Sequence, residues 1–223
     1  MKALLYKEFK LAMHPICYVF IVLFPMMILI PSYPLAVGFI YVLSCYPILF
    51  LGANKGQQSN DLLFSTLLPV RKKDIVLARI ITVIFMQVAF MLIMSALWPV
   101  ALMITSNIPD YVPAGLGLDA FISVLGIAII GYAVADLIFF PIYYKHGKSI
   151  VMSTLLTMLG FIVYLGAFTV ALPFIPATKV IGDILSGPIW VQLIILFSAI
   201  FVSFGLHCLV YKISAKRLEQ VDF

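Results

Sequence analysis

Long apolar stretches, separated by short polar breaks, constrain this chain more than any other feature. A helix needs roughly 20 mostly apolar residues to cross a hydrocarbon core about 30 Å thick. The apolar runs are continuous rather than alternating, which favours helices over barrel strands. Hydrophobic residues make up 64% of the chain and charged residues only 10%, against about 45–50% and 25% in a soluble domain. We therefore predict an all-α membrane protein whose six transmembrane helices lie within residues 16–31, 33–53, 75–105, 118–144, 150–172 and 189–213.

The Lys and Arg residues are distributed very unevenly between the connections. Thirteen of the 14 fall on one side of the predicted spans, and Lys179 alone falls on the other. Cytoplasmic connections near helix ends retain positive charge. The distribution predicts that both termini are cytoplasmic. We expect the protein to lie in the plasma membrane. The net charge of +5 is thus a topology signal, and we expect no nucleic-acid partner.

Two further segments are predicted to lie at the membrane surfaces. Residues 1–14 place Leu5 and Phe9 on one helical face and Lys7 and Lys10 on the other, which is typical of an amphipathic interfacial helix. The alternative is a solvated basic tail. Residues 173–188, "PFIPATKVIGDILSGP", are apolar enough to re-enter the membrane as a short outer hairpin.

Enzyme motifs are missing from the sequence. It contains no HExxH and no GxSxG, which zinc proteases and α/β-hydrolases require. "HGKSI" resembles the end of a phosphate-binding loop, but Ile142 occupies the position of its first glycine. The three cysteines and three histidines lack metal-ligand spacing, and His207 stands alone on a predicted span. We expect no catalytic, metal or cofactor site and no ATP hydrolysis by this chain alone.

The connection 54–74 concentrates charge in an otherwise apolar sequence. "NKGQQSN" is polar, and "DLLFSTLL" then provides about two turns of mostly apolar helix, too short to span a membrane. Pro69 ends this helix, and Asp74 suits the first turn of the next one. The segment has two interpretations. Its short apolar helix docks on a partner protein, or the connection is a basic loop whose side chains reach the lipid headgroups. The residues predicted to contact a partner are Asp61, Leu62, Leu63, Phe64, Leu67, Leu68, Pro69, Val70, Arg71, Lys72, Lys73 and Asp74.

This segment also carries a family resemblance. "LLFSTLLPVRKKDIVLARI" resembles the part of ABC-2 type permeases that commonly reads "SLPVSRKEIVLAKYL", with Arg71 at the usual serine and Thr66 as an extra residue. "PIYYKHGKSI" is similar to the run that follows the fourth span in that family. The start "MKALLYKEFKLAMHP" and the basic tail resemble the ends of these permeases. The resemblance therefore extends over a single domain, 1–223.

The resemblance implies a function for this domain. An ABC-2 permease pairs with an identical or sister permease over two ABC ATPase subunits, which bind ATP and Mg. The 54–74 segment would hold the coupling helix that contacts the ATPase, so this chain would be a transport subunit and not an enzyme. The subgroup closest in pattern includes exporters of amphipathic peptides, such as the phenol-soluble modulin exporters, and immunity pumps for peptide antibiotics.

Gln87 and Asp136 are the most notable polar residues inside the predicted spans. Polar side chains are costly in lipid unless they face a cavity or a partner helix. We expect Asp136 either to pair with Lys145, Lys148 or a neighbouring helix, or to contact the substrate. Gln87 has the same two interpretations, an interhelix contact or the translocation path.

Three other functions remain open on the sequence. One is the substrate-binding membrane component of an energy-coupling, vitamin-type importer, although the first span lacks the AxxxA run of that class. Another is an ABC-2 exporter of a non-peptide drug or lipid-like substrate. The third, an intramembrane enzyme, lacks nucleophile and metal motifs.

Overall fold

The secondary structure that can be described is entirely helical. The computed structural model describes residues 2–13, 15–31, 35–44, 70–108, 117–146, 150–171 and 179–220. Within these ranges the prediction of an all-α membrane protein is confirmed. The elements are α1 (Lys2–Lys7), η1 (Glu8–Ala12), α2 (Pro15–Leu23), η2 (Phe24–Leu29), α3 (Leu35–Ile40), η3 (Tyr41–Ser44), α6 (Lys72–Ser106), η4 (Leu118–Ala120), α7 (Phe121–His146), α8 (Ile150–Leu165), η5 (Gly166–Ala171), α10 (Lys179–Leu185) and α11 (Ile189–Glu219).

Four helical segments among the described residues are long and apolar enough to cross a membrane. They are Lys72–Ser106, Leu118–Lys145, Ile150–Phe168 and Ile189–Glu219. A fifth is obtained if Lys2–Lys10 and Pro15–Leu29 are counted together as one bent span. The predicted second span, 33–53, contains α3 and η3, and its remainder lies outside the described residues. The count of six spans therefore stays a prediction.

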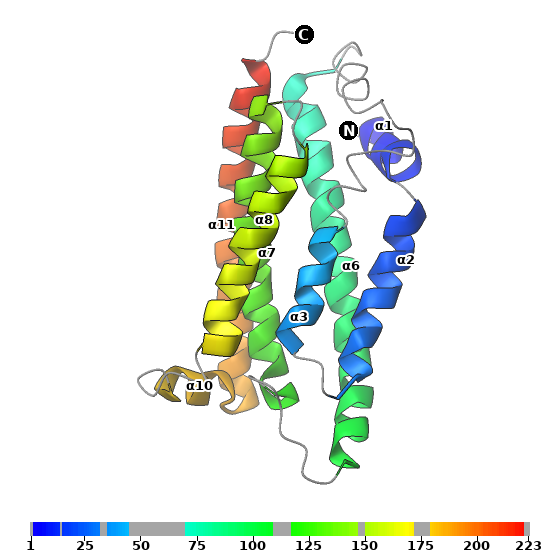
Figure 1. Ribbon diagram of the computed structural model, residues 1–223. Coiled ribbons are helices and arrows are strands. Elements are labelled where there is room, and N and C mark those ends of the chain that lie inside the picture. Colours follow the sequence, from blue (N-terminus) through cyan, green and yellow to red (C-terminus); the bar gives the residue numbers. More distant parts are fainter. Residues whose placement is uncertain are drawn as a thin grey trace.

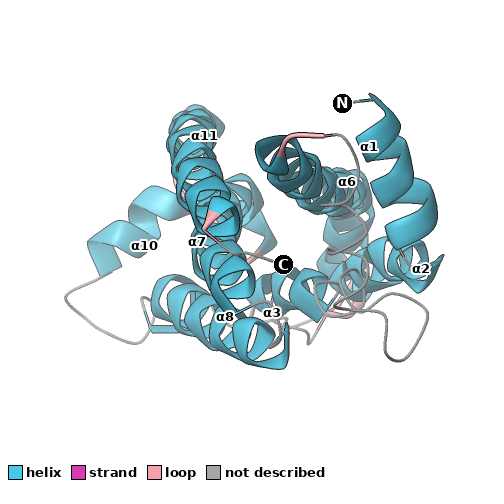
Figure 2. Cartoon of the chain, turned by 90° about the horizontal axis from the view of Figure 1, so that it is seen from above, coloured by secondary structure: helices cyan, strands magenta, loops and turns pink. Residues whose placement is uncertain are grey.

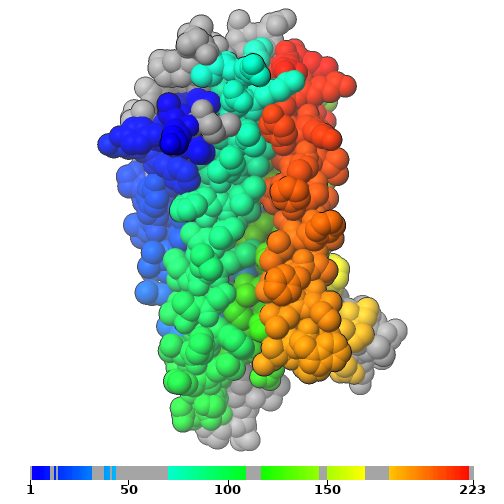
Figure 3. Space-filling view, turned by 180° about the vertical axis from the view of Figure 1, so that it is seen from behind, coloured from blue at the N-terminus to red at the C-terminus, as the bar shows by residue number. Residues whose placement is uncertain are grey.

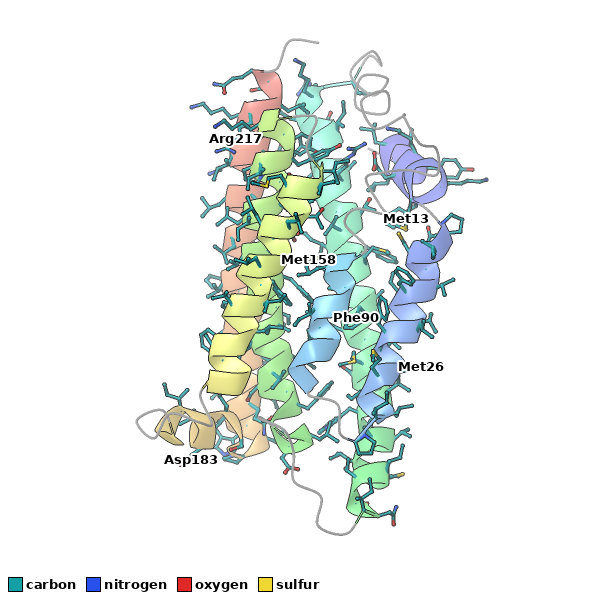
Figure 4. All side chains as sticks on the ribbon, viewed as in Figure 1. Met13, Met26, Phe90, Met158, Asp183 and Arg217 are labelled. Atoms are coloured by element: carbon teal, nitrogen blue, oxygen red, sulfur yellow. The ribbon has the colours of Figure 1, made fainter. Side chains whose placement is uncertain are left out.

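The amino-terminal region bends sharply between its first two helical segments. Lys2–Lys10 and Pro15–Leu29 meet at 77°. Met13 has an extended backbone (φ −77°, ψ 123°) and lies at the junction of the two segments (Figure 4). Pro15 cannot continue the preceding helix, because it lacks an N–H and restricts the residue before it. A surface helix followed by a span needs such a bend, and the interfacial position of residues 1–14 stays a prediction.

The long helices form two groups (Figures 1 and 2). Seen from above, α7, α8 and α11 lie together on one side, and α6 lies with α1 and α2 on the other. Both termini lie at the end where α6 begins and α11 ends (Figure 1). We call it the basic end, because it carries Arg71, Lys72, Lys73, Lys212, Lys216 and Arg217.

Aromatic side chains from α3 connect the two groups. Phe39 is fully buried and contacts Phe90 of α6, with ring centroids 6.2 Å apart. The Tyr132 hydroxyl of α7 donates to the Phe39 carbonyl at 2.8 Å. The Tyr132 ring stacks on Phe161 of α8 at 5.0 Å. Aromatic pairs of this kind contribute about 0.5–1.5 kcal/mol beyond their burial, so α3 stabilises the contact between the groups.

The second half of the predicted outer hairpin forms α10. This short helix lies at the end opposite the basic end, and Asp183 on α10 and Arg217 mark the two ends (Figure 4). Ser123 Oγ donates to the Leu185 carbonyl at 2.7 Å, so α10 is fastened to the start of α7. Residues 173–178 lie outside the described residues. Re-entry of 173–188 into the membrane stays a prediction.

Candidate functional site: buried polar contacts along α6

Polar side chains connect α6 to α7, and to η4 directly before it, at three successive depths. Arg79 Nη1 donates to the Tyr143 hydroxyl at 2.8 Å, and Gln87 Nε2 donates to Asp136 Oδ2 at 3.1 Å. Trp98 Nε1 donates to the Leu118 carbonyl at 3.0 Å. The partner numbers fall along α7 and η4 as they rise on α6, as an antiparallel pair requires. Interhelical hydrogen bonds within a membrane contribute roughly 0.6–2 kcal/mol each. Together these contacts therefore fix the register of the two helices.

The first contact belongs to a buried ion-pair cluster, which we name the Arg79 cluster: Glu8, Arg79 and Tyr143. Arg79 and Glu8 are each only 3% exposed, and Arg79 Nε lies 3.5 Å from the Glu8 carboxylate. Lys7 Nζ lies 3.6 Å from the same carboxylate. The Arg79 guanidinium also lies over the Tyr143 ring, 5.9 Å from its centroid. This cluster joins the amino-terminal segment to α6 and α7.

The second contact belongs to what we name the Asp136 cluster: Gln87, Asp136, Ser203 and His207. Asp136 is fully buried and accepts from Gln87 of α6. His207 Nε2 of α11 lies 3.0 Å from the same Oδ2 atom. Asp136 therefore connects three spans through one carboxylate oxygen. A buried carboxylate within apolar spans is stable only when it is paired in this way.

The His207 ring is held at both of its nitrogens. Nδ1 lies 2.8 Å from the Ser203 backbone carbonyl and 3.2 Å from the Ser203 hydroxyl oxygen. Nε2 lies 3.0 Å from Asp136 Oδ2. Which of these contacts the ring donates depends on its tautomer. The contacts fix the position of the ring between α7 and α11.

The structure brings together both polar residues singled out within the predicted spans. Gln87 and Asp136 are in direct hydrogen-bond contact, so Asp136 has a partner on a neighbouring helix. The pairing of Asp136 with Lys148 falls outside the described residues.

The predicted partner-contact segment is described only in part. Its residues from Asp61 to Pro69 lie outside the described residues, and Val70 to Asp74 lie within them. Arg71 precedes α6 in an extended conformation and gives no side-chain cap to it. Asp74 occupies the first turn of α6. Lys73 Nζ lies 3.3 Å from Glu219 at the end of α11 in a half-exposed ion pair.

Sequence reasoning missed Glu8, Arg79 and Tyr143 as a cluster and treated His207 as isolated. Signals for both clusters were nevertheless present. Glu8 is the only acid before Asp61, and an arginine inside an apolar helix needs a carboxylate nearby. Asp136 and His207 lie at similar distances from the basic ends of their helices, so their depths in a membrane match.

Metal binding finds no support among the residues that the structure describes. No group of three or more His, Cys, Asp and Glu side chains in these ranges lies close enough to hold a metal ion. The two clusters consist of hydrogen bonds and ion pairs between helices. These contacts hold neighbouring helices in one relative position.

Long apolar helices joined by buried ionisable pairs define a multi-pass membrane protein. A comparison with known protein families matches residues 3–216 to the family described as ABC-2 family transporter protein. The chain therefore belongs to the ABC-2 transporter family. It is a membrane permease of an ABC transporter; the family has no ATPase site of its own and works with an ABC ATPase. Searches of curated proteins and of solved structures found no match.

Proposed function

We propose that this chain is the membrane subunit of an ATP-driven exporter of amphipathic peptides. Two ATPase subunits supply the energy, and a second permease, identical or a sister chain, completes the path. Both termini and the 54–74 segment face the cytoplasm of a cell whose plasma membrane holds the complex. This orientation rests on the thirteen cations that share one side of the spans.

The observation that carries the proposal is the position of α6. This 35-residue helix begins at Lys72, directly after the segment that resembles a coupling helix, and contains both Arg79 and Gln87. Residues 72–87 rise about 22 Å along the helix axis, and they precede Pro99, the proline inside this helix. Force applied to 54–74 would therefore reach the Arg79 cluster and the Asp136 cluster through one continuous element.

Movement of α6 would have two consequences inside the bundle. At the Arg79 cluster, α6 is attached to the amino-terminal segment through Glu8 and to α7 through Tyr143. At the Asp136 cluster, it is attached to α7 and indirectly to α11. Discrete polar contacts of this kind favour alternative packings over continuous deformation. We infer that ATP binding shifts α6 between two such packings.

The peptide substrate rests on family analogy, because residues 62–80 resemble ABC-2 permeases and the subgroup closest in pattern includes exporters of amphipathic peptides. A direct test uses the permease reconstituted with its ATPase in liposomes. An amphipathic helical peptide should stimulate ATP hydrolysis severalfold and accumulate on the side opposite the ATPase only when ATP is present. A scrambled peptide of equal composition and lower amphipathicity is the control. Equal responses to the two peptides would overturn the peptide assignment and leave a drug or lipid-like substrate.

A further inference from the structure

A groove lies between α6 and α11 on the surface of the bundle, and α7 forms its floor. Figure 3 shows α6 and α11 side by side on this face, with a seam between them. The groove encloses about 470 Å³. Its walls include Val88 and Leu92 of α6 and Ile200 and Phe204 of α11, with Leu125 of α7 beneath them. A space of this size is within the usual range for ligand sites.

The walls of the groove present hydrocarbon outward. Leu92 is 65% exposed and Phe204 is 71% exposed, while Val88 and Ile200 are each 48% exposed. His207 lines the groove near one end, but its two ring nitrogens already contact Ser203 and Asp136. The groove therefore favours an apolar chain over a ligand that needs hydrogen bonds.

The position of the groove along the spans follows from the aromatic and basic residues beyond its ends. Trp98 on α6 and Trp190 on α11 lie toward the end opposite the basic end, where interfacial tryptophans are typical. Lys212 is five residues beyond His207 on α11, which is about 7 Å along a helix. The groove thus runs from near the basic membrane surface toward the bilayer centre.

The basic end supplies positive charge next to this opening. The ends of α6 and α11 there carry six cations, Arg71, Lys72, Lys73, Lys212, Lys216 and Arg217, against the two carboxylates of Asp74 and Glu219. Lys73 is paired with Glu219, and Arg217 donates to the Pro141 carbonyl. Lys212 and Lys216 are exposed. Clusters of such cations at the ends of spans attract anionic lipid headgroups.

We propose that this groove binds an anionic phospholipid of the leaflet at the basic end. One acyl chain lies between α6 and α11, and the headgroup contacts Lys212 and Lys216. The exposed cations at the opening complement the negative charge of such a headgroup, and the charge therefore favours an anionic lipid as the occupant.

The test measures lipids that stay bound to the purified permease–ATPase complex by native mass spectrometry, with phosphatidylglycerol and phosphatidylcholine supplied in equal amounts. Val88→Trp fills the groove, and Val163→Trp is the matched control, because Val163 is an exposed valine (63%) on α8. The wild type and V163W should retain phosphatidylglycerol. V88W should bind it about tenfold more weakly, which corresponds to about 1.4 kcal/mol.

A second variant pair tests the headgroup contact and guards against poor folding. K212Q/K216Q should reduce the preference for phosphatidylglycerol over phosphatidylcholine to near equality while leaving the groove intact. Ile200→Trp, on the opposite wall, should reproduce the effect of V88W. Equal lipid retention in V88W, I200W and V163W would overturn the proposal. So would loss of permease pairing, or of peptide-stimulated ATP hydrolysis, in V88W with lipid retention unchanged, since the occupant would then be a second copy or the substrate.

Discussion

Asp136 is the residue on which most of the intramembrane polar structure depends. It accepts from Gln87 of α6 and contacts His207 of α11 through one oxygen. Leaving either partner unpaired in an apolar interior carries a desolvation cost. The Asp136 side chain therefore holds α6, α7 and α11 together. Substitutions can separate the effect of its charge from that of its hydrogen bonds.

Asp136→Ala is expected to lower the free energy of unfolding in detergent by roughly 2–4 kcal/mol, because two interhelical hydrogen bonds at about 1–2 kcal/mol each are removed. Asp136→Asn should lose less than about half of that, since an amide oxygen in the place of Oδ2 can accept from both Gln87 and the N–H of His207 Nε2. Denaturant titration monitored by circular dichroism measures both. Equal destabilisation by the two variants would show that charge, and not hydrogen bonding, holds the helices together.

Arg79→Leu leaves Glu8 as a buried carboxylate without its arginine, so we expect a loss of about 3–5 kcal/mol in unfolding free energy. The double variant Glu8→Leu/Arg79→Leu should recover most of this loss, because an apolar pair of similar volume often replaces a buried ion pair without cost. A double-mutant cycle in the same titration gives the coupling energy. Additive losses would contradict a direct interaction between the two side chains.

At the scale of elements, the contact between α7 and α8 depends on the absence of a side chain at Gly131. A Cβ atom there would lie 2.8 Å from the Phe161 ring and 2.9 Å from Tyr164. Gly131→Ala should therefore destabilise the protein by about 1–3 kcal/mol through overpacking. Gly205→Ala on α11, where a Cβ meets nothing within 4 Å, should be neutral or stabilise by up to about 1 kcal/mol. Thermal unfolding gives the midpoint temperature of each variant. Similar midpoints for Gly131→Ala and Gly205→Ala would contradict this packing.

A single alanine inserted between Asp74 and Ile75 tests whether α6 transmits movement from the 54–74 segment into the bundle. The insertion rotates everything before it by about 100° relative to the rest of the helix. We expect the complex to assemble and hydrolyse ATP but to transport little substrate. An alanine inserted between Glu219 and Gln220 in the basic tail is the control. Transport at the wild-type rate with the first insertion would show that α6 does not transmit the movement.

The main helices could be predicted from the sequence because their signal is local. The predicted span 75–105 corresponds to α6 (Lys72–Ser106), and 118–144 corresponds to η4 and α7. The last helix continues to Glu219, beyond the predicted end at residue 213, because its basic tail has good helix formers and no proline or glycine to stop it. Apolar length marks where a span lies, but not where a helix ends outside the lipid.

The pairing of polar side chains was less predictable. Gln87 and Asp136 stand out because each is polar within an apolar run, yet hydropathy does not reveal which helices are neighbours. His207 becomes a partner only when α11 is placed against α7. Glu8 and Arg79 are 71 positions apart in sequence, and only the bend before α2 brings the amino-terminal segment over α6.

For the molecule as a whole, the helical fold is joined to an energy source outside this chain, and the contact between the two is proposed. The ABC-2 family match over residues 3–216 establishes a permease that needs an ATPase. The proposed contact for that ATPase is the apolar face of the 54–74 segment, and α6 is the element that continues from it into the bundle.

The most direct test of this claim replaces Leu67 and Leu68 by aspartate in the full permease and measures ATP-dependent transport and co-purification of the ATPase. Gln220→Asp, an exposed position in the basic tail, is the charge control. We expect L67D/L68D to insert into the membrane normally but to lose the ATPase, and transport with it, whereas Q220D should behave as the wild type. Unchanged transport and ATPase binding in L67D/L68D would contradict the proposed contact.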